Sequence, residues 1–244
     1  MALASLQHLV IVNGWSANST FWDEFGLGLV GAFQVDILDL DQDKTLEDYL
    51  TELDQLITSE TVLLGWSLGG SLALEYAATR GAKFKALITT QTNPCFVARD
   101  DWPDAVNIED FYSLSGLVES YDRTGLVRRF SRLMITGSER YKIDRSYLKQ
   151  VYRLDGLPKR SCLESCLNML HDLDMRQRYS EICIPSLHVF GGKDQLLPAN
   201  LSSDIAQLNL AHQVSVIPEM AHLPVGAFRS EFQTAINNFV ATLT

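Results

Sequence analysis

The chain has 244 residues, of which 46% are hydrophobic and 20% charged, a size and composition typical of one globular domain with a substantial core. No apolar run reaches the roughly 20 residues that a membrane-spanning helix needs, and the first residues lack the basic and apolar segments of a signal peptide. The formal net charge of −10 argues against general nucleic-acid binding, so we expect a cytoplasmic protein that binds neither nucleic acid nor membrane.

Short apolar runs alternate with helical patterns over most of the chain. The runs predict strands, and the patterns between them predict helices, at these positions: strands at 6–12, 33–38, 61–64, 84–89, 185–190 and 213–217, and helices at 20–29, 46–57, 71–79, 200–208 and 228–243. The apolar runs do not alternate strictly with polar residues, which is typical of strands buried on both faces of a parallel sheet. We therefore predict an α/β fold with a mostly parallel, doubly wound sheet.

This alternation stops between residues 102 and 180, where apolar residues recur three or four positions apart in a polar sequence. A helical insertion after one strand of such a sheet lies over the C-terminal ends of the strands, where these folds bind ligands. We predict one domain, with a core of residues 1–101 and 181–244 and a helical lid of residues 102–180.

One part of the predicted lid is strongly basic. Between Arg123 and Arg160 it contains eleven of the chain's 20 basic residues and only three acidic ones, a net charge of +8 that leaves −18 on the rest of the chain. An acidic body with one basic region predicts an acidic partner that docks on the lid.

The segment Gly65-Trp66-Ser67-Leu68-Gly69 matches the G-x-S-x-G motif of a nucleophile elbow. In this motif a serine lies on a strained turn between strand and helix, and the glycines leave room for the neighbouring backbone. The motif is short, and a glycine-rich turn with a structural serine is the alternative. A predicted buried strand before it and a helix of small residues after it favour the catalytic interpretation. We predict an α/β-hydrolase fold with Ser67 as nucleophile.

The partners of this serine are predicted from the order Ser, Asp, His that the fold requires. Asp194 follows the strand at 185–190, and His222 follows the strand at 213–217, so both emerge at the same edge of the sheet as Ser67. We assign His222 as the base and Asp194 as the acid that orients it.

Other residues of these types are weaker candidates. Asp204 and Glu219 are rivals for the acid, but neither directly follows a strand and a glycine turn. The remaining histidines lie within predicted strands, at the start of one or in the lid, where a structural or surface role is favoured: His8, His188, His212 and His171.

The predicted reaction is acyl transfer, in which the oxyanion needs two backbone N–H donors. Leu68, directly after the nucleophile, is expected to supply one, and Trp15, in the turn after the first strand, the other. Side chains, backbone amides and water suffice for this reaction, so we expect no cofactor. We also expect no metal, because Cys162 and Cys166 lie one helical turn apart without a second ligand pair.

Four segments together give the chain a narrower resemblance. In these segments the chain resembles the pimeloyl-[acyl-carrier protein] methyl ester esterases of biotin synthesis. The segments are Asn13-Gly14-Trp15-Ser16-Ala17-Asn18 with Phe21-Trp22, Gly65 to Gly70, Leu173-Asp174-Met175-Arg176-Gln177 and Ala221-His222-Leu223-Pro224. The similarity covers most of the chain, and the lid matches only loosely. The elbow is general to α/β-hydrolases, whereas Trp15 and Trp66 make the assignment specific. Asn13 departs from the family, whose members usually have histidine there.

The resemblance implies a serine carboxylesterase that hydrolyses the methyl ester of a pimeloyl chain on acyl-carrier protein, releasing methanol. It implies that Trp15, Trp66 and Phe130 contact the substrate. It also implies that lid cations bind the acidic carrier. Arg129 and Lys142 occupy two of the family's basic positions, whereas Gly125 and Ser146 occupy two others. Three neighbouring arginines are expected to substitute there: Arg128, Arg132 and Arg145. We expect the chain to act as a monomer.

Two other functions remain open from the sequence. One is a small-molecule carboxylesterase or thioesterase with the same triad and no carrier partner. The other is a non-catalytic receptor of the same fold, because some receptors keep all three triad residues.

Overall fold

The structure is a computed structural model that describes residues 8–29, 34–81, 84–120, 122–198 and 200–243. Six strands form one sheet, in which every pair of neighbours is parallel: β1 (His8–Val12), β2 (Gln34–Leu38), β3 (Thr61–Trp66), β4 (Ala86–Thr90), β5 (Ser186–Gly191) and β6 (Gln213–Ile217). Their order across the sheet is β2-β1-β3-β4-β5-β6. The predicted parallel, doubly wound sheet is therefore confirmed, with a strand at each of the six predicted places.

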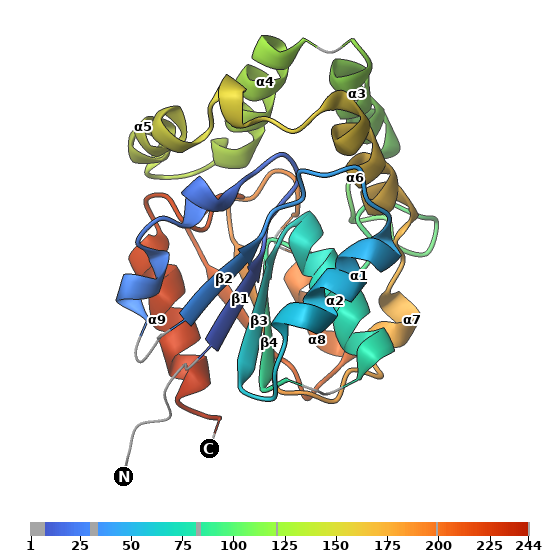
Figure 1. The fold of residues 1–244 in the computed structure, drawn as a ribbon, viewed down its shortest axis with the longest axis vertical. Helices are drawn as coiled ribbons and strands as arrows, with labels where there is room; N and C mark the ends of the chain where they lie inside the picture. The colour runs from blue at the N-terminus through green and yellow to red at the C-terminus, as the bar shows by residue number, and fades with distance from the viewer. Residues whose placement is uncertain (1–7, 30–33, 82–83, 121, 199, 244) are drawn as a thin grey trace.

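Helices cover both faces of this sheet. The α-helices are α1 (Leu46–Leu56), α2 (Leu68–Arg80), α3 (Ile108–Glu119), α4 (Arg123–Ile135), α5 (Tyr141–Val151), α6 (Arg160–Asp172), α7 (Arg176–Tyr179), α8 (Leu201–Leu208) and α9 (Arg229–Val240). Helices α1 and α2 lie on one face and α9 on the other (Figure 1). None of the helices described is long and apolar enough to cross a membrane.

The central strands form the core because their side chains are apolar on both faces. In the register of the sheet, Leu64 of β3 lies opposite Ile11 of β1 and Ile88 of β4, and all three side chains are fully buried. Burying both faces in this way requires helices on each side, which the crossover connections supply.

One predicted helix is wrong. In place of a helix at 20–29 the chain forms two short 3₁₀ helices, Ser19–Trp22 and Phe25–Gly28, separated by Glu24 in the left-handed region at φ 62°. Gly26 and Gly28 disfavour a continuous helix, and Phe21, Trp22 and Phe25 are buried in the core. Tertiary burial of these rings decides the conformation of this segment.

The segment between β4 and β5 forms α3 to α7, of which α3, α4, α5 and α6 lie beyond the C-terminal ends of the strands (Figure 1). A buried carboxylate ties α5 to the loop after β6. Asp144 accepts hydrogen bonds from the Ser138 hydroxyl at 2.5 Å and the Ala227 amide at 2.7 Å. Burial raises the pKa of Asp144 despite these bonds. The contact of Asp144 with Ala227 thus joins the helical segment to the core, and the segment lies over the end of the sheet where the predicted triad residues emerge.

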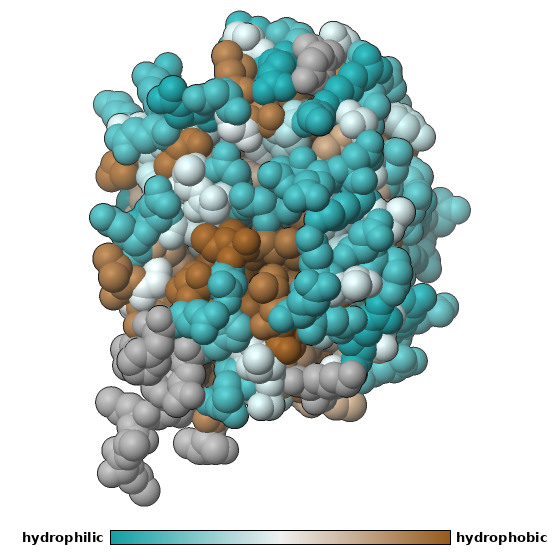
Figure 2. Space-filling model, in the orientation of Figure 1, coloured by the Kyte–Doolittle hydropathy of each residue, from teal (hydrophilic) through white to brown (hydrophobic). Residues whose placement is uncertain are grey.

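The surface differs between these two parts. In the view of Figure 2 the helices beyond the sheet present mainly hydrophilic surface, whereas apolar surface gathers over the sheet edge at β2 and β1. The first two residues of the edge strand β2, Gln34 and Val35, are exposed. In this view the surface of the helical segment is the more polar of the two.

Candidate active site

Ser67 lies on a strained turn between β3 and α2. Its backbone has φ 54° and ψ −120°, a conformation that costs about 1–3 kcal/mol for a residue with a side chain and persists only where the surroundings enforce it. A Cβ at Gly69 would overlap the Val12 carbonyl oxygen, and one at Gly65 would overlap the backbone of Gly69. The glycines of the motif are therefore required by the close approach of β1, β3 and α2.

The structure brings the three predicted triad residues together in a hydrogen-bonded row. His222 Nε2 lies 3.1 Å from Ser67 Oγ, and His222 Nδ1 lies 2.7 Å from Asp194 Oδ2. The exposed fractions of Ser67, Asp194 and His222 are 9%, 5% and 1%. The row is thus nearly shielded from solvent, which strengthens its electrostatic interactions.

The tautomer of His222 follows from its partners. The Asp194 carboxylate can only accept, so Nδ1 carries the proton and Nε2 is left to accept from the Ser67 hydroxyl. The other oxygen of Asp194, Oδ1, accepts hydrogen bonds from the backbone amides of Leu196 at 2.8 Å and Leu197 at 3.1 Å. Both carboxylate oxygens are therefore engaged, and the arrangement can move a proton from serine to imidazole.

Asp194, rather than Asp204 or Glu219, is the hydrogen-bond partner of His222. The other histidines have different partners. His8 Nε2 lies 2.8 Å from Asp36 Oδ2, and His171 Nδ1 lies 2.7 Å from Asp172 Oδ1.

His188 and His212 form a buried pair beneath the site. His188 Nε2 lies 3.0 Å from His212 Nδ1, and His188 Nδ1 lies 2.7 Å from the Thr89 hydroxyl. Burial and the neighbouring His212 lower the pKa of His188 to about 3, and burial lowers the pKa of His212 as well. Both imidazoles are therefore neutral in the folded protein at neutral pH.

This pair predicts a loss of stability in acid. The unfolded chain binds a proton at each histidine near pH 6.5, whereas the folded chain resists protonation of His188 down to about pH 3. Stability is fully present above pH 6.5 and falls as pH decreases toward 3. Below pH 6 we expect His188→Gln to reduce the pH dependence of the free energy of unfolding by about 1.4 kcal/mol per pH unit. Urea unfolding between pH 4.5 and 7.5 measures this, and equal slopes in both proteins would contradict it.

The two amides predicted for the oxyanion hole belong to Trp15, in the turn after β1, and to Leu68, directly after the nucleophile. Leu68 is the first residue of α2, where a helix leaves its N–H groups without an intrahelical acceptor. Of the backbone bonds found outside regular helices and strands in the described chain, none uses the amide of Trp15 or Leu68. Both N–H groups are thus free of these backbone bonds, and their role as an oxyanion hole stays a prediction.

Asn13 holds the turn that carries Trp15. Its side-chain oxygen accepts the Trp22 indole N–H at 2.6 Å, and its amide nitrogen donates to Asp39 Oδ1 at 2.5 Å. Burial raises the pKa of Asp39, although the bonds from Asn13 and Ser19 oppose that shift. Asparagine thus both donates and accepts here, as a neutral histidine can, which explains why it is compatible with the turn.

Two residues that were not predicted from the sequence contact the triad segments. The Thr92 hydroxyl donates to the Ser67 carbonyl at 3.0 Å, and the Gln91 side chain bonds to the loops after β5 and β6. The available signal was Thr89-Thr90-Gln91-Thr92-Asn93, an unbroken polar run that follows a buried strand and is itself buried. Within the described residues, no group of three or more metal-ligating side chains is found.

Comparison with known proteins shows the family of the chain. Residues 38–226 match the family described as alpha/beta hydrolase fold. The chain is 30% identical over 240 residues to the pimeloyl-[acyl-carrier protein] methyl ester esterase of Yersinia pseudotuberculosis, covering 95% of this chain and 92% of that protein. It is also 30% identical over 226 residues to the protein of the same name from Klebsiella pneumoniae, covering 89% and 87% of the two chains.

The chain belongs to the pimeloyl-[acyl-carrier protein] methyl ester esterase family. The structure of a bromoperoxidase from Bacillus anthracis superposes with a TM-score of 0.85 at 18% identity, covering 96% of this chain and 91% of that one, and shows the shared fold. The predicted α/β-hydrolase fold, the resemblance to this family and the esterase class are confirmed.

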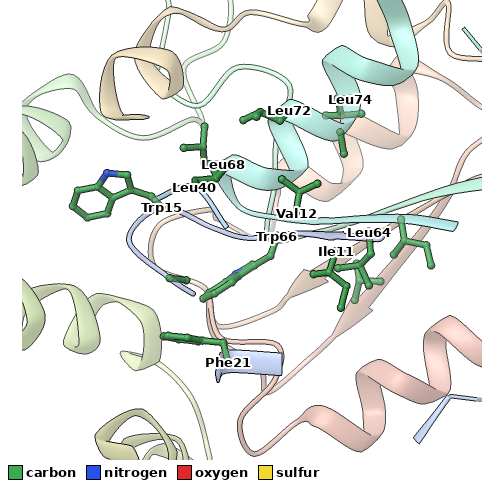
Figure 3. Close-up of a cluster of buried hydrophobic side chains, with 14 of the residues drawn as sticks. Ile11, Val12, Trp15, Phe21, Leu40, Leu64, Trp66, Leu68, Leu72 and Leu74 are labelled. Carbon is green, nitrogen blue, oxygen red and sulfur yellow. The ribbon is translucent and has the colours of Figure 1, made fainter. Parts of the chain in front are cut away.

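The aromatic residues that the family resemblance implied as substrate contacts are all buried. Trp15 packs edge-on against Phe130 of α4 at 4.9 Å between ring centroids, and its indole donates to the Leu163 carbonyl of α6 at 3.0 Å. The Trp66 indole donates to the His222 carbonyl at 3.1 Å. Figure 3 shows Trp66 beside Phe21 in the buried cluster, with the Trp15 ring pointing away from both. A substrate contact of these three aromatic residues stays a prediction.

The predicted carrier-binding cations do not all line the same cavity. Arg128, Arg132 and Arg145 line a groove of about 490 Å³ between α4 and α5, together with Lys149. Arg129 lines a separate pocket of about 330 Å³ beside α3, and Lys142 lines neither of these two cavities. Among the described residues, none of these six cations forms an ion pair.

Proposed function

We propose that the protein is a serine carboxylesterase that hydrolyses the methyl ester of pimeloyl-acyl-carrier protein to pimeloyl-acyl-carrier protein and methanol in biotin synthesis. The observation that carries the proposal is the row Asp194–His222–Ser67 in a member of this family. All three side chains come from one chain, so a monomer suffices. The proposal places the reaction in the cytoplasm.

In the first half-reaction, Ser67 Oγ attacks the ester carbonyl carbon while His222 Nε2 takes the hydroxyl proton. The bond from the carbonyl carbon to the methoxy oxygen then breaks, and the proton on Nε2 passes to that oxygen. Methanol leaves, and the pimeloyl chain remains esterified to Ser67. Asp194 holds the imidazole in the accepting tautomer and stabilises its positive charge.

In the second half-reaction, water replaces the alcohol. His222 Nε2 takes a proton from the water as its oxygen attacks the acyl carbonyl. The bond to Ser67 Oγ breaks and the proton returns to that oxygen, which leaves a free carboxylate at the end of the pimeloyl chain. In both halves we propose that the amides of Trp15 and Leu68 hold the oxyanion, each donor being worth about 3–4 kcal/mol in such sites.

The helical segment 102–180 is proposed as the lid over this site, on a core of residues 1–101 and 181–244. Phe130 and Trp15 bring α4 into contact with the turn after β1, next to the nucleophile. With Ser67 only 9% exposed, an acyl chain reaches it by separating these apolar groups. We propose that Trp15, Trp66 and Phe130 then line the acyl channel, because apolar side chains favour a methylene chain over water.

The carrier is proposed to dock on the lid through its cations: Arg128, Arg129, Arg132, Lys142 and Arg145. Unpaired guanidinium groups are suited to the carboxylates of an acidic protein. Three of these cations converge on the groove between α4 and α5, where their fields add. We propose this groove as the centre of the docking surface.

The substrate itself tests the proposal. We expect kcat/KM for methyl pimeloyl-acyl-carrier protein to exceed that for methyl pimelate by at least about 100-fold, because carrier contacts add binding energy that the free ester lacks. Steady-state assays with both esters and a p-nitrophenyl ester measure it. Equal kcat/KM for carrier-linked and free esters would favour the small-molecule esterase, and rescue of a strain without its own esterase on biotin-free medium would support the proposed pathway.

Charge reversal in the groove tests carrier docking separately from the chemistry. We expect Arg132→Glu with Arg145→Glu to lower kcat/KM for the carrier-linked ester by about 10- to 100-fold at low salt, with less effect at high salt. The p-nitrophenyl ester should be unaffected, because it makes no carrier contact. Lys83→Glu with Lys85→Glu changes the net charge equally outside residues 102–180 and serves as the control. Equal losses on both substrates would refute docking at this groove.

A further inference from the structure

The last residue of β4 and the two residues after it bind the chain at or near each triad residue. The Thr90 carbonyl accepts the Ser67 amide at 3.0 Å, and the Thr92 hydroxyl donates to the Ser67 carbonyl at 3.0 Å. Between them, the Gln91 side chain extends to the other two triad loops. Three consecutive residues thus join the nucleophile turn to the loops that carry the acid and the base.

Gln91 makes two hydrogen bonds with the two ends of one amide group. Its Oε1 accepts the backbone N–H of Gly191 at 2.9 Å, where β5 ends three residues before Asp194. Its Nε2 donates to the carbonyl of Ala221, the residue before His222. Only a side chain that both donates and accepts can connect these two loops in this way.

The surroundings hold Gln91 in one conformation. Its side chain and backbone are 1% exposed, its amide donates to the Val189 carbonyl at 3.0 Å, and its φ of 51° is in the left-handed region. A non-glycine residue keeps this conformation only where its contacts enforce it. A Cβ at Gly191 would overlap the Ala221 carbonyl and the Gln91 amide, so the two loops and this side chain pack at closest approach.

The bond from Gln91 is one of a pair that holds the backbone of the base. Gln91 binds the carbonyl before His222, and the Trp66 indole binds the carbonyl of His222 itself at 3.1 Å. His222 lies in a loop that leaves the sheet after β6, so these bonds help determine where its ring lies. Its Nε2 must remain near 3.1 Å from Ser67 Oγ to take the proton.

We propose that Gln91 is a positioning residue for the triad. Together with the backbone bonds from Gly192 to Ile217 and from Lys193 to Met220, both 2.9 Å, it sets the distance between the acid loop and the base loop. The inference rests on the proposed function, because its effect is read in ester hydrolysis. Gln91 touches no substrate atom in this proposal and acts only through the placement of Asp194 and His222.

The test is Gln91→Met, which keeps the length of the side chain and removes both hydrogen bonds. We expect kcat for a p-nitrophenyl ester to fall by about 10- to 100-fold, the effect of a misplacement of about 1 Å, while KM stays nearly constant. The rate at which a fluorophosphonate labels Ser67 should fall in parallel. Gln91→Asn keeps the amide and favours a left-handed φ, but it is too short to reach both loops, so we expect a similar loss of kcat in a stably folded protein.

Gln233→Met is the matched control. Gln233 is a buried glutamine of α9 whose Nε2 donates to the Phe25 carbonyl at 2.6 Å, away from the triad loops. This variant removes a buried amide-to-carbonyl bond of the same kind, so its melting temperature should fall as in Gln91→Met while kcat is retained. If Gln91 had only a structural role, Gln91→Met would lower the melting temperature and retain kcat, as is expected for Gln233→Met.

The outcomes separate the two proposals. Wild-type protein that hydrolyses no ester contradicts the proposed function. Active wild-type protein with kcat retained in the folded Gln91 variants overturns the positioning role alone. If Gln91→Met yields no folded protein, Gln91→Asn is the test: a loss of kcat supports the positioning role, and a retained kcat overturns it.

Discussion

We expect Ser67→Ala to lower kcat for ester hydrolysis by about a million-fold. The substitution removes the atom that forms the acyl-enzyme. His222 and Asp194 stay in place, but His222 has no hydroxyl proton to receive. Because the three residues act as one unit, His222→Ala should cost a similar factor, and the double variant should be little worse than either single one. Steady-state kinetics with a p-nitrophenyl ester, supported by fluorophosphonate labelling, measures both.

Ser71→Ala is the matched control for this experiment. Ser71 is a buried serine one turn further along α2, so the same hydroxyl is removed from the same helix without touching the row. It should retain kcat. Substantial hydrolysis by Ser67→Ala, after correction for contaminating esterases, would show that another nucleophile carries the reaction.

The second large effect is expected at Asp194. We expect Asp194→Asn to lower kcat by about 10⁴-fold with little change in fold. The asparagine oxygen can still accept the amides of Leu196 and Leu197, as Oδ1 does now. Its NH₂ group then faces His222 Nδ1 and forces that nitrogen to accept. The ring proton moves to Nε2, which can no longer take the proton of Ser67.

Asp36→Asn provides the comparison for this change. Asp36 forms another aspartate–histidine hydrogen bond in the chain, 2.8 Å to His8. His8 is the first residue of β1 and Asp36 lies in the middle of the edge strand β2, away from the strand ends that carry the triad. The same chemical change there should leave kcat within about twofold, as surface substitutions away from special features do. A small loss in Asp194→Asn, close to that of Asp36→Asn, would mean that Asp194 does not set the tautomer of His222.

The sequence by itself determined the sheet and the identities of the residues that meet on it. Runs such as Leu9 to Val12 and Val62 to Leu64 are apolar on both faces, a local property that predicts buried parallel strands without knowledge of their neighbours. Because parallel strands share one C-terminal edge, the residues after β3, β5 and β6 were expected to converge. The structure places Ser67, Asp194 and His222 within hydrogen-bonding distance there.

Only the tertiary structure decided what depends on contacts between distant segments. The apolar pattern at 20–29 is compatible with a helix, but burial of Phe21, Trp22 and Phe25 against the core selects two 3₁₀ turns. Charge counting placed the cations on the lid, yet the packing of α4 and α5 separates Arg129 from the groove that holds Arg132. Gln91 shows the reason most directly, since its partners lie 100 and 130 residues away along the chain and no local pattern encodes such contacts.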